Sequence, residues 1–97
     1  MKYGGKVMTE LKSLPNIGQE LETKLKSIGI TSIEELKSEG SKTVFLKLKN
    51  KYANVCLVHL YCLQGAIDSV AYNNLPDDIK KDLKKYSDSL KEIVKPY

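Results

Sequence analysis

Residues 55–72, with the sequence VCLVHLYCLQGAIDSVAY, form the most apolar stretch of the chain and carry one charged side chain, Asp68. The stretch is far longer than a buried strand of roughly 4 to 8 residues and is rich in helix formers, so it predicts a helix with Asn54 as its N-cap. Because apolar residues lie on every side, we expect other helices to surround it. His59 and Gln64 interrupt the apolar run before the roughly 18 residues of a membrane span, so we predict a buried core helix and no membrane insertion.

Shorter amphipathic segments on both sides of this stretch predict the helices that wrap it. Apolar residues recur in each of them at helical spacing. The expected ranges are residues 7–14, about 19–28, 31–40, 41 to about 52, and 76 to about 94. The sequence therefore predicts an all-α fold of about six short helices around a central apolar helix.

Turn and capping residues mark where these helices begin and end. Pro15 ends the first helix, because proline cannot continue one. Gly29 followed by Ile30 has the form of a Schellman cap, in which a glycine takes a left-handed backbone and the next apolar residue packs on the helix. Ser32 and Glu35 have the S-x-x-E form of a capping box. We therefore expect one helix to end at Gly29 and the next to begin near Ser32.

Length and composition fit one small domain. The 97 residues, 41% of them hydrophobic, suffice for one modest core, and we predict a single domain over residues 1–97. Cys56 and Cys62 are six residues apart on the central helix and point in well-separated directions, so we expect both to be reduced core residues. The start of the chain has no apolar run of signal-peptide length, which makes the cytoplasm the expected location.

The net charge of +4 allows a polyanionic partner, and every basic residue is a lysine. Arginine supplies the two-pronged contact that most often reads guanine, so its absence argues against sequence-specific base readout while leaving phosphate contacts available. An AT-rich coding sequence would explain the missing arginine equally well. Most of the net charge comes from the predicted helix at 41–52, which holds Lys42, Lys47, Lys49 and Lys51 and no acid.

Few residues are candidates for catalysis. His59 is the only histidine, and it lies between Cys56 and Cys62 on the most apolar helix. A structural zinc site needs four ligands, and no further cysteine or histidine exists, so the sequence predicts no metal site and no cofactor. A cysteine–histidine nucleophile would need an accessible pocket and an orienting third group. We interpret all three as core residues and predict that the protein is not an enzyme, with a thiol-dependent activity at Cys56 or Cys62 as a remote alternative.

The sharpest functional signal is LKSLPNIGQELETKLKSIGI at residues 11–30, two short helices joined by a turn with proline and glycine. The pattern resembles a helix-hairpin-helix, which presents backbone N–H groups and a helix N-terminus to a DNA phosphate. We predict weak, non-sequence-specific DNA contact by Lys12, Pro15, Asn16, Ile17, Gly18 and Lys24. Asn16 replaces the usual first glycine, and Glu20 and Glu22 add negative charge nearby. A helix-pair turn that only packs on the core is therefore an equal alternative.

Two stretches together resemble the C-terminal domain of the TfoX (Sxy) family of bacterial competence regulators. Residues 14–36, LPNIGQELETKLKSIGITSIEEL, are similar to the family's L-x-N-[IL]-G segment followed by a helix and G-I-x-[ST]-x-x-[DE]-L. Residues 60–76, LYCLQGAIDSVAYNNLP, are similar to its L-x-x-L-Y-A-L-x-G-A-L pattern closing on W-x-x-L-P. Cys62 replaces the usual alanine and Tyr72 the usual tryptophan, and we interpret both as changes within the core.

The resemblance implies an all-helical fold that contains a helix-hairpin-helix-like unit. Members of the family promote natural transformation by acting with a cyclic-AMP receptor protein at competence promoters. Full-length members also carry a separate N-terminal domain, which we do not find in these 97 residues. The resemblance therefore implies a stand-alone C-terminal domain with a regulatory role.

Two hypotheses for function follow. The first is a non-enzymatic DNA-binding or transcription-regulatory module that contacts phosphates through the bend at residues 15–18. The second is a protein-interaction module, either a homodimer or the partner of a transcription regulator, without direct DNA binding. The acids Glu20 and Glu22, which would repel DNA, support the second hypothesis, as do Leu46 and Tyr97 if their apolar surfaces are exposed.

Overall fold

The structure, a computed structural model, describes residues 11–93, with the exception of the side chains of Lys12 and residues 91–93. Every regular element in this range is helical, and the predicted all-α class is confirmed for it. The elements are η1 (Leu11–Ser13), α1 (Gln19–Ser27), α2 (Ile33–Glu39), α3 (Ser41–Lys51), α4 (Leu57–Asp68), η2 (Tyr72–Asn74) and α5 (Asp77–Ile93), where η marks a 3-10 helix.

The helix α4 is the middle of the fold, as predicted, but it is shorter than residues 55–72. It begins after Cys56, whose backbone is extended, so Asn54 is not its N-cap. It ends at Asp68, and the C-cap residue Ser69 adopts a left-handed backbone with φ of 62°. Val55 is buried although it precedes the helix. The helix therefore occupies only the central part of the apolar run.

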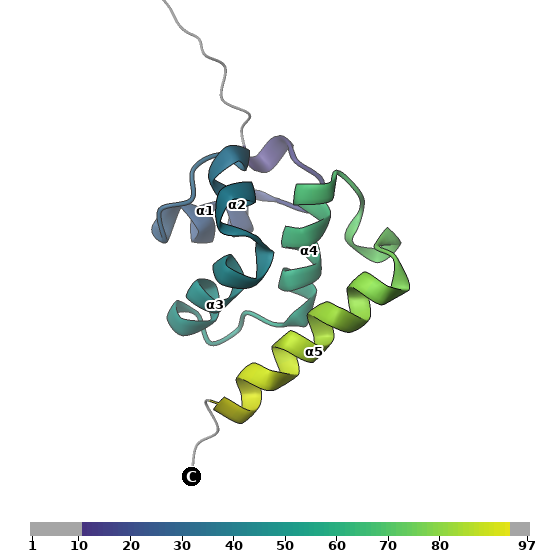
Figure 1. The fold of residues 1–97 in the computed structure, drawn as a ribbon. Coiled ribbons are helices and arrows are strands. Elements are labelled where there is room, and N and C mark those ends of the chain that lie inside the picture. Colours follow the sequence, from purple (N-terminus) through teal and green to yellow (C-terminus); the bar gives the residue numbers. More distant parts are fainter. Residues whose placement is uncertain (1–10, 94–97) are drawn as a thin grey trace, which may run out of the picture.

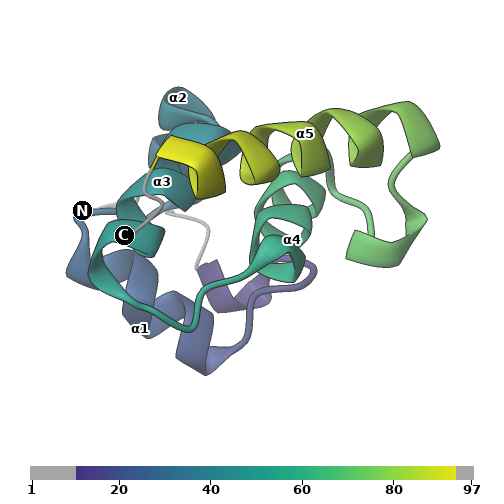
Figure 2. The same cartoon turned by 90° about the horizontal axis from the view of Figure 1, so that it is seen from below.

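The other helices cover α4 incompletely. Figure 1 shows α4 in the middle with α1, α2 and α3 on one side and α5 running diagonally along the other. In the perpendicular view, α5 and α1 lie on opposite sides of the molecule, with α3 and α4 between them (Figure 2). Leu60 and Leu63 of α4 are buried, but Val58 is 48% exposed. The prediction that α4 is surrounded on every side is therefore wrong at its first turn.

The predicted cap at Gly29 is confirmed in detail. Gly29 has a φ of 90°, a conformation that favours glycine, and its N–H donates to the carbonyl of Lys26 at 3.1 Å. The N–H of Ile30 donates to the carbonyl of Leu25 at 2.9 Å, and Ile30 is buried. These two bonds are those of a Schellman motif, which turns the chain sharply from α1 toward α2.

The predicted start of α2 is also confirmed. The Ser32 hydroxyl accepts from the backbone N–H of Glu35 at 3.2 Å. The Glu35 carboxylate reaches one residue further back than a capping box requires and accepts from both the hydroxyl and the backbone N–H of Thr31, each at 2.7 Å. These bonds lower the pKa of Glu35, because they stabilise its charged form.

The two arms expected for a helix-hairpin-helix are not both α-helices. The described part of the first arm is the three-residue 3-10 helix η1, and Val7 and Met8, on which its prediction also depended, lie outside the described residues. The second arm, α1, spans Gln19–Ser27 as expected. The structure therefore supports a turn followed by a helix, and a helix-hairpin-helix is not confirmed.

Candidate functional site

The bend at residues 15–18 turns two of its residues inward. Ile17 is buried, and Asn16 has a φ of 73°, the left-handed backbone that glycine usually takes at such a turn. Pro15 and Gly18 are exposed. Asn16 therefore takes the backbone conformation that a glycine would take at such a turn, because asparagine tolerates it better than most residues.

The Asn16 side chain ties the bend to the segment that follows α4. Its amide nitrogen donates to the carbonyl of Val70 at 2.9 Å and lies 3.5 Å from the carbonyl of Cys62. Its amide oxygen accepts from the backbone N–H of Tyr72 at 2.9 Å. These bonds join parts of the chain that are more than 40 residues apart, so Asn16 has a structural role that its prediction as a DNA contact did not include.

Gly65 makes this connection possible. A Cβ atom at position 65 would overlap the Asn16 amide nitrogen and would lie 2.6 Å from the carbonyl oxygen of Val70, so only glycine fits here without movement. We call Asn16, Gly65, Val70 and Tyr72 the Asn16 junction. The two stretches that carry the family resemblance, 14–36 and 60–76, meet at this junction, and that pairing was the signal in the sequence that residue-by-residue reasoning missed.

Tyr72 is 41% exposed although its backbone belongs to the junction, so its interpretation as a core residue is wrong. The backbone N–H of Tyr72 donates to the Asn16 amide oxygen, and the Cα of Tyr72 lies close to where a Cβ on Gly65 would be. The backbone at position 72 is therefore fixed, while the ring is largely on the surface.

Of the two lysines predicted beside the bend, Lys24 is not available as a basic surface. Lys24 is only 9% exposed, its ammonium lies 3.1 Å from the Glu20 carboxylate, and it stacks 5.1 Å from the centre of the Tyr52 ring. The Glu20 side chain is 83% exposed. The side chain of Lys12 lies outside the described part of the chain. The structure therefore places Lys24 in a packed cluster, with an exposed acid near the bend.

The four lysines of α3 are each held by a neighbour. They bind two carboxylates and two backbone carbonyls: Lys42 with Asp82 at 2.7 Å, Lys47 with Glu39 at 2.7 Å, Lys49 with the Val55 carbonyl at 2.9 Å, and Lys51 with the Ser27 carbonyl at 3.1 Å. A carbonyl does not cancel the charge of the lysine that donates to it. The positive charge of α3 therefore remains strongest at Lys49 and Lys51.

A groove runs between α3 and α5 and consists of three depressions. The first, of about 320 Å³, lies at the start of α3 against residues 79–83 of α5. The second, of about 220 Å³, shares Lys42 and Asp82 with the first. The third, of about 290 Å³, lies one helical turn further along, between Leu46 and Leu90. We call these three depressions together the α3–α5 groove.

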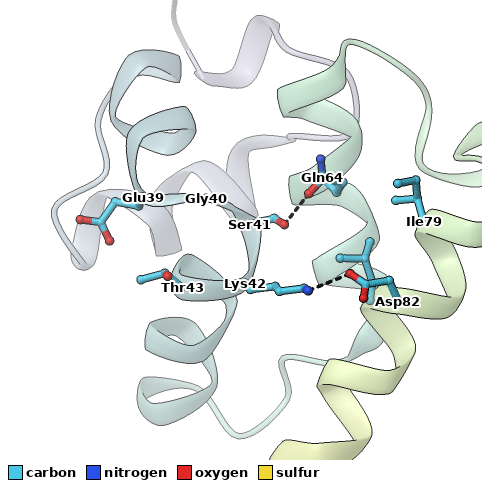
Figure 3. Close-up of a pocket in the computed structure, with 9 residues that line it drawn as sticks. Glu39, Gly40, Ser41, Lys42, Thr43, Gln64, Ile79 and Asp82 are labelled. Carbon is cyan, nitrogen blue, oxygen red and sulfur yellow. Dashed lines mark hydrogen bonds and ion pairs between the residues drawn. The ribbon is translucent and has the colours of Figure 1, made fainter.

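Few contacts cross this groove. Figure 3 shows Lys42 extending from α3 to Asp82 on α5, and the same ammonium lies 5.6 Å from the centre of the Tyr86 ring. Next to it, the buried Ser41 hydroxyl donates to the side-chain oxygen of Gln64 on α4 at 2.6 Å (Figure 3). The first bond spans α3 and α5, whereas the second fixes α3 to α4.

Cys56 and His59 are not the core residues that we expected, whereas Cys62 is partly buried and packs against the core. Cys56 is exposed, and the Nδ1 atom of His59 accepts from its backbone N–H at 3.0 Å, so His59 caps the start of α4. Cys62 is half-buried, and this burial raises the pKa of its thiol, which Cys56 raises further. In the described part of the chain, no three His, Cys, Asp or Glu side chains converge into a metal-binding group. None of the described helices is long and apolar enough to cross a membrane.

Comparison with known proteins gives consistent matches. The family described as the TfoX C-terminal domain matches residues 7–86. The chain is 34% identical to Protein Sxy of Escherichia coli K12 over 80 residues, which cover 82% of this chain and 38% of Sxy, so it spans well under half of that relative.

Two crystal structures from Listeria monocytogenes are similar to this chain over most of both lengths. A triclinic form of an uncharacterized protein matches with a TM-score of 0.84 and 40% identity, and the match covers 86% of this chain and 94% of that one. A tetragonal form of a protein of unknown function matches with a TM-score of 0.81 and 41% identity, covering 84% of this chain and 99% of that one.

Proposed function

The chain belongs to the TfoX C-terminal domain family, and on that premise we propose that it is a non-enzymatic regulatory module of the competence type that works by binding a partner protein. The family relationship supports the regulatory role. The mode of action rests on the architecture of this chain, because the match covers only part of Sxy.

The observation that carries this proposal is the α3–α5 groove. Its walls bring together partly buried apolar residues, Leu46, Ile79 and Tyr86, on two helices that few contacts join. The depressions lie at or below the low end of the roughly 300 to 1,000 Å³ found for small-molecule pockets, so they suit side chains of a partner better than a cofactor.

Crosslinking tests the proposal directly. A photoreactive amino acid replaces Leu46 in the groove in one variant. In the control it replaces Lys26, an exposed residue of α1, and α1 lies on the other side of the molecule from α5 (Figure 2). In the native cell, we expect the Leu46 variant to give a discrete protein adduct and the Lys26 variant to give none. The absence of a protein adduct at Leu46, or adducts that contain nucleic acid, would contradict the proposal.

DNA binding through the bend is a second candidate, and one observation favours it. The backbone of the bend keeps the left-handed turn at Asn16, with Pro15 and Gly18 exposed at the start of α1. Backbone N–H groups at a helix start bind phosphates. The exposed Glu20 and the buried Lys24 argue for weak affinity, in the range of about 10⁻⁴ to 10⁻⁶ M that is usual for non-specific contacts.

Two substitutions at Gly18 isolate this candidate. Aspartate and asparagine are both good N-cap residues, so Gly18→Asp and Gly18→Asn should both fold. Only the aspartate repels a phosphate. Anisotropy of a labelled duplex at low salt should show weaker binding for Gly18→Asp than for Gly18→Asn. Equal isotherms, or no titration at high micromolar protein, would rule out phosphate contact at the bend.

A further inference from the structure

We propose that the α3–α5 groove binds an acidic amphipathic helix of a partner protein, with apolar side chains of that helix in the depressions and its carboxylates against the lysines of the groove. This inference rests on the proposed function and adds the chemistry of the partner to it.

The groove has the length and periodicity of a helix surface. The start of α3 faces residues 79–83 of α5, and its end faces Leu90, so the two helices run in the same direction. The lining residues advance by about one turn along both walls: Lys42, Leu46 and Asn50 on α3, and Asp82, Tyr86 and Leu90 on α5. At 1.5 Å per residue, the wall from Gly40 to Asn50 is about 15 Å long, which matches three turns of a docked helix.

The apolar surface of the groove is shared between its walls. Leu46 on α3 and Ile79 and Tyr86 on α5 are partly buried and pack on the core, so each also keeps an accessible face. Their positions in separate depressions match the spaced apolar anchors of an amphipathic helix. A partner with isolated apolar residues would fill only one of them.

The charge of the groove selects an acidic partner. Its second and third depressions are lined by three lysines, Lys42, Lys49 and Lys85, and by one acid, Asp82. The helix α3 itself has no acid, and Glu39, which lines the first depression just before α3, is paired with Lys47. The three depressions together therefore carry three lysines against two acids, Glu39 and Asp82. Asp82 already bonds to Lys42, so a carboxylate of the partner competes with it for the same ammonium.

Other occupants fit the groove less well. The first ten residues of this chain, MKYGGKVMTE, contain two lysines and one glutamate and therefore have the wrong sign of charge. A second copy of the chain is a distinct outcome, because it would make the molecular mass depend on protein concentration.

The binding test uses the whole chain and a labelled synthetic peptide of about 14 residues, with leucines at helical spacing and glutamates elsewhere. We expect Lys85→Glu to weaken binding by roughly 5- to 10-fold, because it replaces an attraction with a repulsion at the surface. Lys26→Glu is the matched control for the same charge change on α1 and should leave the affinity within about twofold. Asp82→Asn should strengthen binding about threefold, because Lys42 loses its internal partner.

Two further peptides make the test decisive. The acidic peptide should bind, while a peptide with lysines in place of the glutamates and another with serines in place of the leucines should not. Equal binding of the serine peptide would overturn the proposal, because the lysines would then act only as a cationic surface that binds any acidic chain. Equal weakening by Lys26→Glu and Lys85→Glu would overturn it as well, and so would a dimer that buries the groove.

The outcome also separates this inference from the proposed function. If the photoreactive group at Leu46 captures a protein but the acidic peptide does not bind, protein binding stands and an acidic helical partner is wrong. If Leu46 captures no protein and the peptide does not bind, both are wrong.

Discussion

The Asn16 junction and the α3–α5 groove both connect distant parts of the chain, but they do so in opposite ways. In the junction, one amide side chain bonds to two backbone groups beyond α4 and packs where only a glycine fits. Across the groove, the ion pair between Lys42 and Asp82 joins two side chains that are 42% and 60% exposed. The difference indicates that the junction fixes the fold, whereas the groove leaves surface for a partner.

The largest effect that would test this contrast is the loss of the Asn16 side chain. Asn16→Ala leaves the Val70 carbonyl and the Tyr72 N–H without these bonds and places alanine in a left-handed backbone. We expect the free energy of unfolding to fall by about 2 to 4 kcal/mol, the sum of the hydrogen-bond and backbone costs. Urea denaturation of the variant and the parent protein measures this difference in the free energy of unfolding.

Asn16→Gly is the matched control for this substitution. Glycine at position 16 loses the same hydrogen bonds but adopts a positive φ without strain. The Asn16→Gly protein should therefore be less destabilised than the Asn16→Ala protein. An Asn16→Ala protein as stable as the parent would show that the junction does not hold the fold together.

A somewhat smaller effect is expected from the other side of the junction. Gly65→Ala pushes a methyl group against the Asn16 amide and the Val70 carbonyl, which should cost about 1 to 3 kcal/mol as an overpacked site. Gly18→Ala is its control, because nothing lies within 4 Å of a Cβ there and the φ of −91° suits alanine. Gly18 is the N-cap of α1, where alanine is less favourable than glycine, so we expect Gly18→Ala to lower the free energy of unfolding by about 0.5 kcal/mol. Similar losses for both variants would mean that the close approach at Gly65 has no special role.

The two cysteines extend the comparison to reactivity. Cys62 contributes its carbonyl to the junction, and burial raises the pKa of its thiol, whereas Cys56 is exposed at the far end of α4. Because the thiolate is the reactive form, iodoacetamide at neutral pH should label Cys56 faster than Cys62. Mass spectrometry of peptides over time measures both rates. Labelling of Cys62 at the rate of Cys56 would show that α4 opens readily around Cys62.

The sequence predicted the end of α1 and the start of α2 because they depend on residues close together in the chain, although the predicted N-cap of α4, Asn54, was wrong. The cap at Gly29 and the Ser32 start follow from local backbone chemistry, and both are present. The role of Asn16 could not be read in the same way, since its partners are 46 to 56 residues away. Sequence reasoning therefore assigned to Asn16 a backbone contact with a phosphate and did not predict the bonds that its side chain makes within the chain.

The groove was missed for a related physical reason. Helical periodicity indicates which face of α5 is apolar, but not which neighbour that face meets. Leu83 and Leu90 are buried, while Leu46 and Ile79 on the same groove are only partly covered. This division depends on the angle at which α5 crosses α3 and α4, and the sequence contains no local signal for that angle. Leu46 alone had been singled out, as an exposed apolar residue.

The smallest effect concerns the ion pair that crosses the groove. Lys42→Gln and Asp82→Asn should each change the free energy of unfolding by less than about 1 kcal/mol, because exposed ion pairs contribute little in water. A double-mutant cycle in urea, repeated at high salt, gives the coupling energy between the two side chains, and salt should reduce this energy further.

A coupling energy of several kcal/mol that resists salt would mean that α3 and α5 are held together as firmly as the two sides of the junction. In that case a carboxylate of a partner helix could not take the place of the Asp82 carboxylate beside Lys42. The Asn16 junction and the α3–α5 groove would then not differ in how firmly they are held. A weak coupling leaves α5 held mainly by α4, with Lys42 able to exchange one carboxylate for another at little cost to the fold.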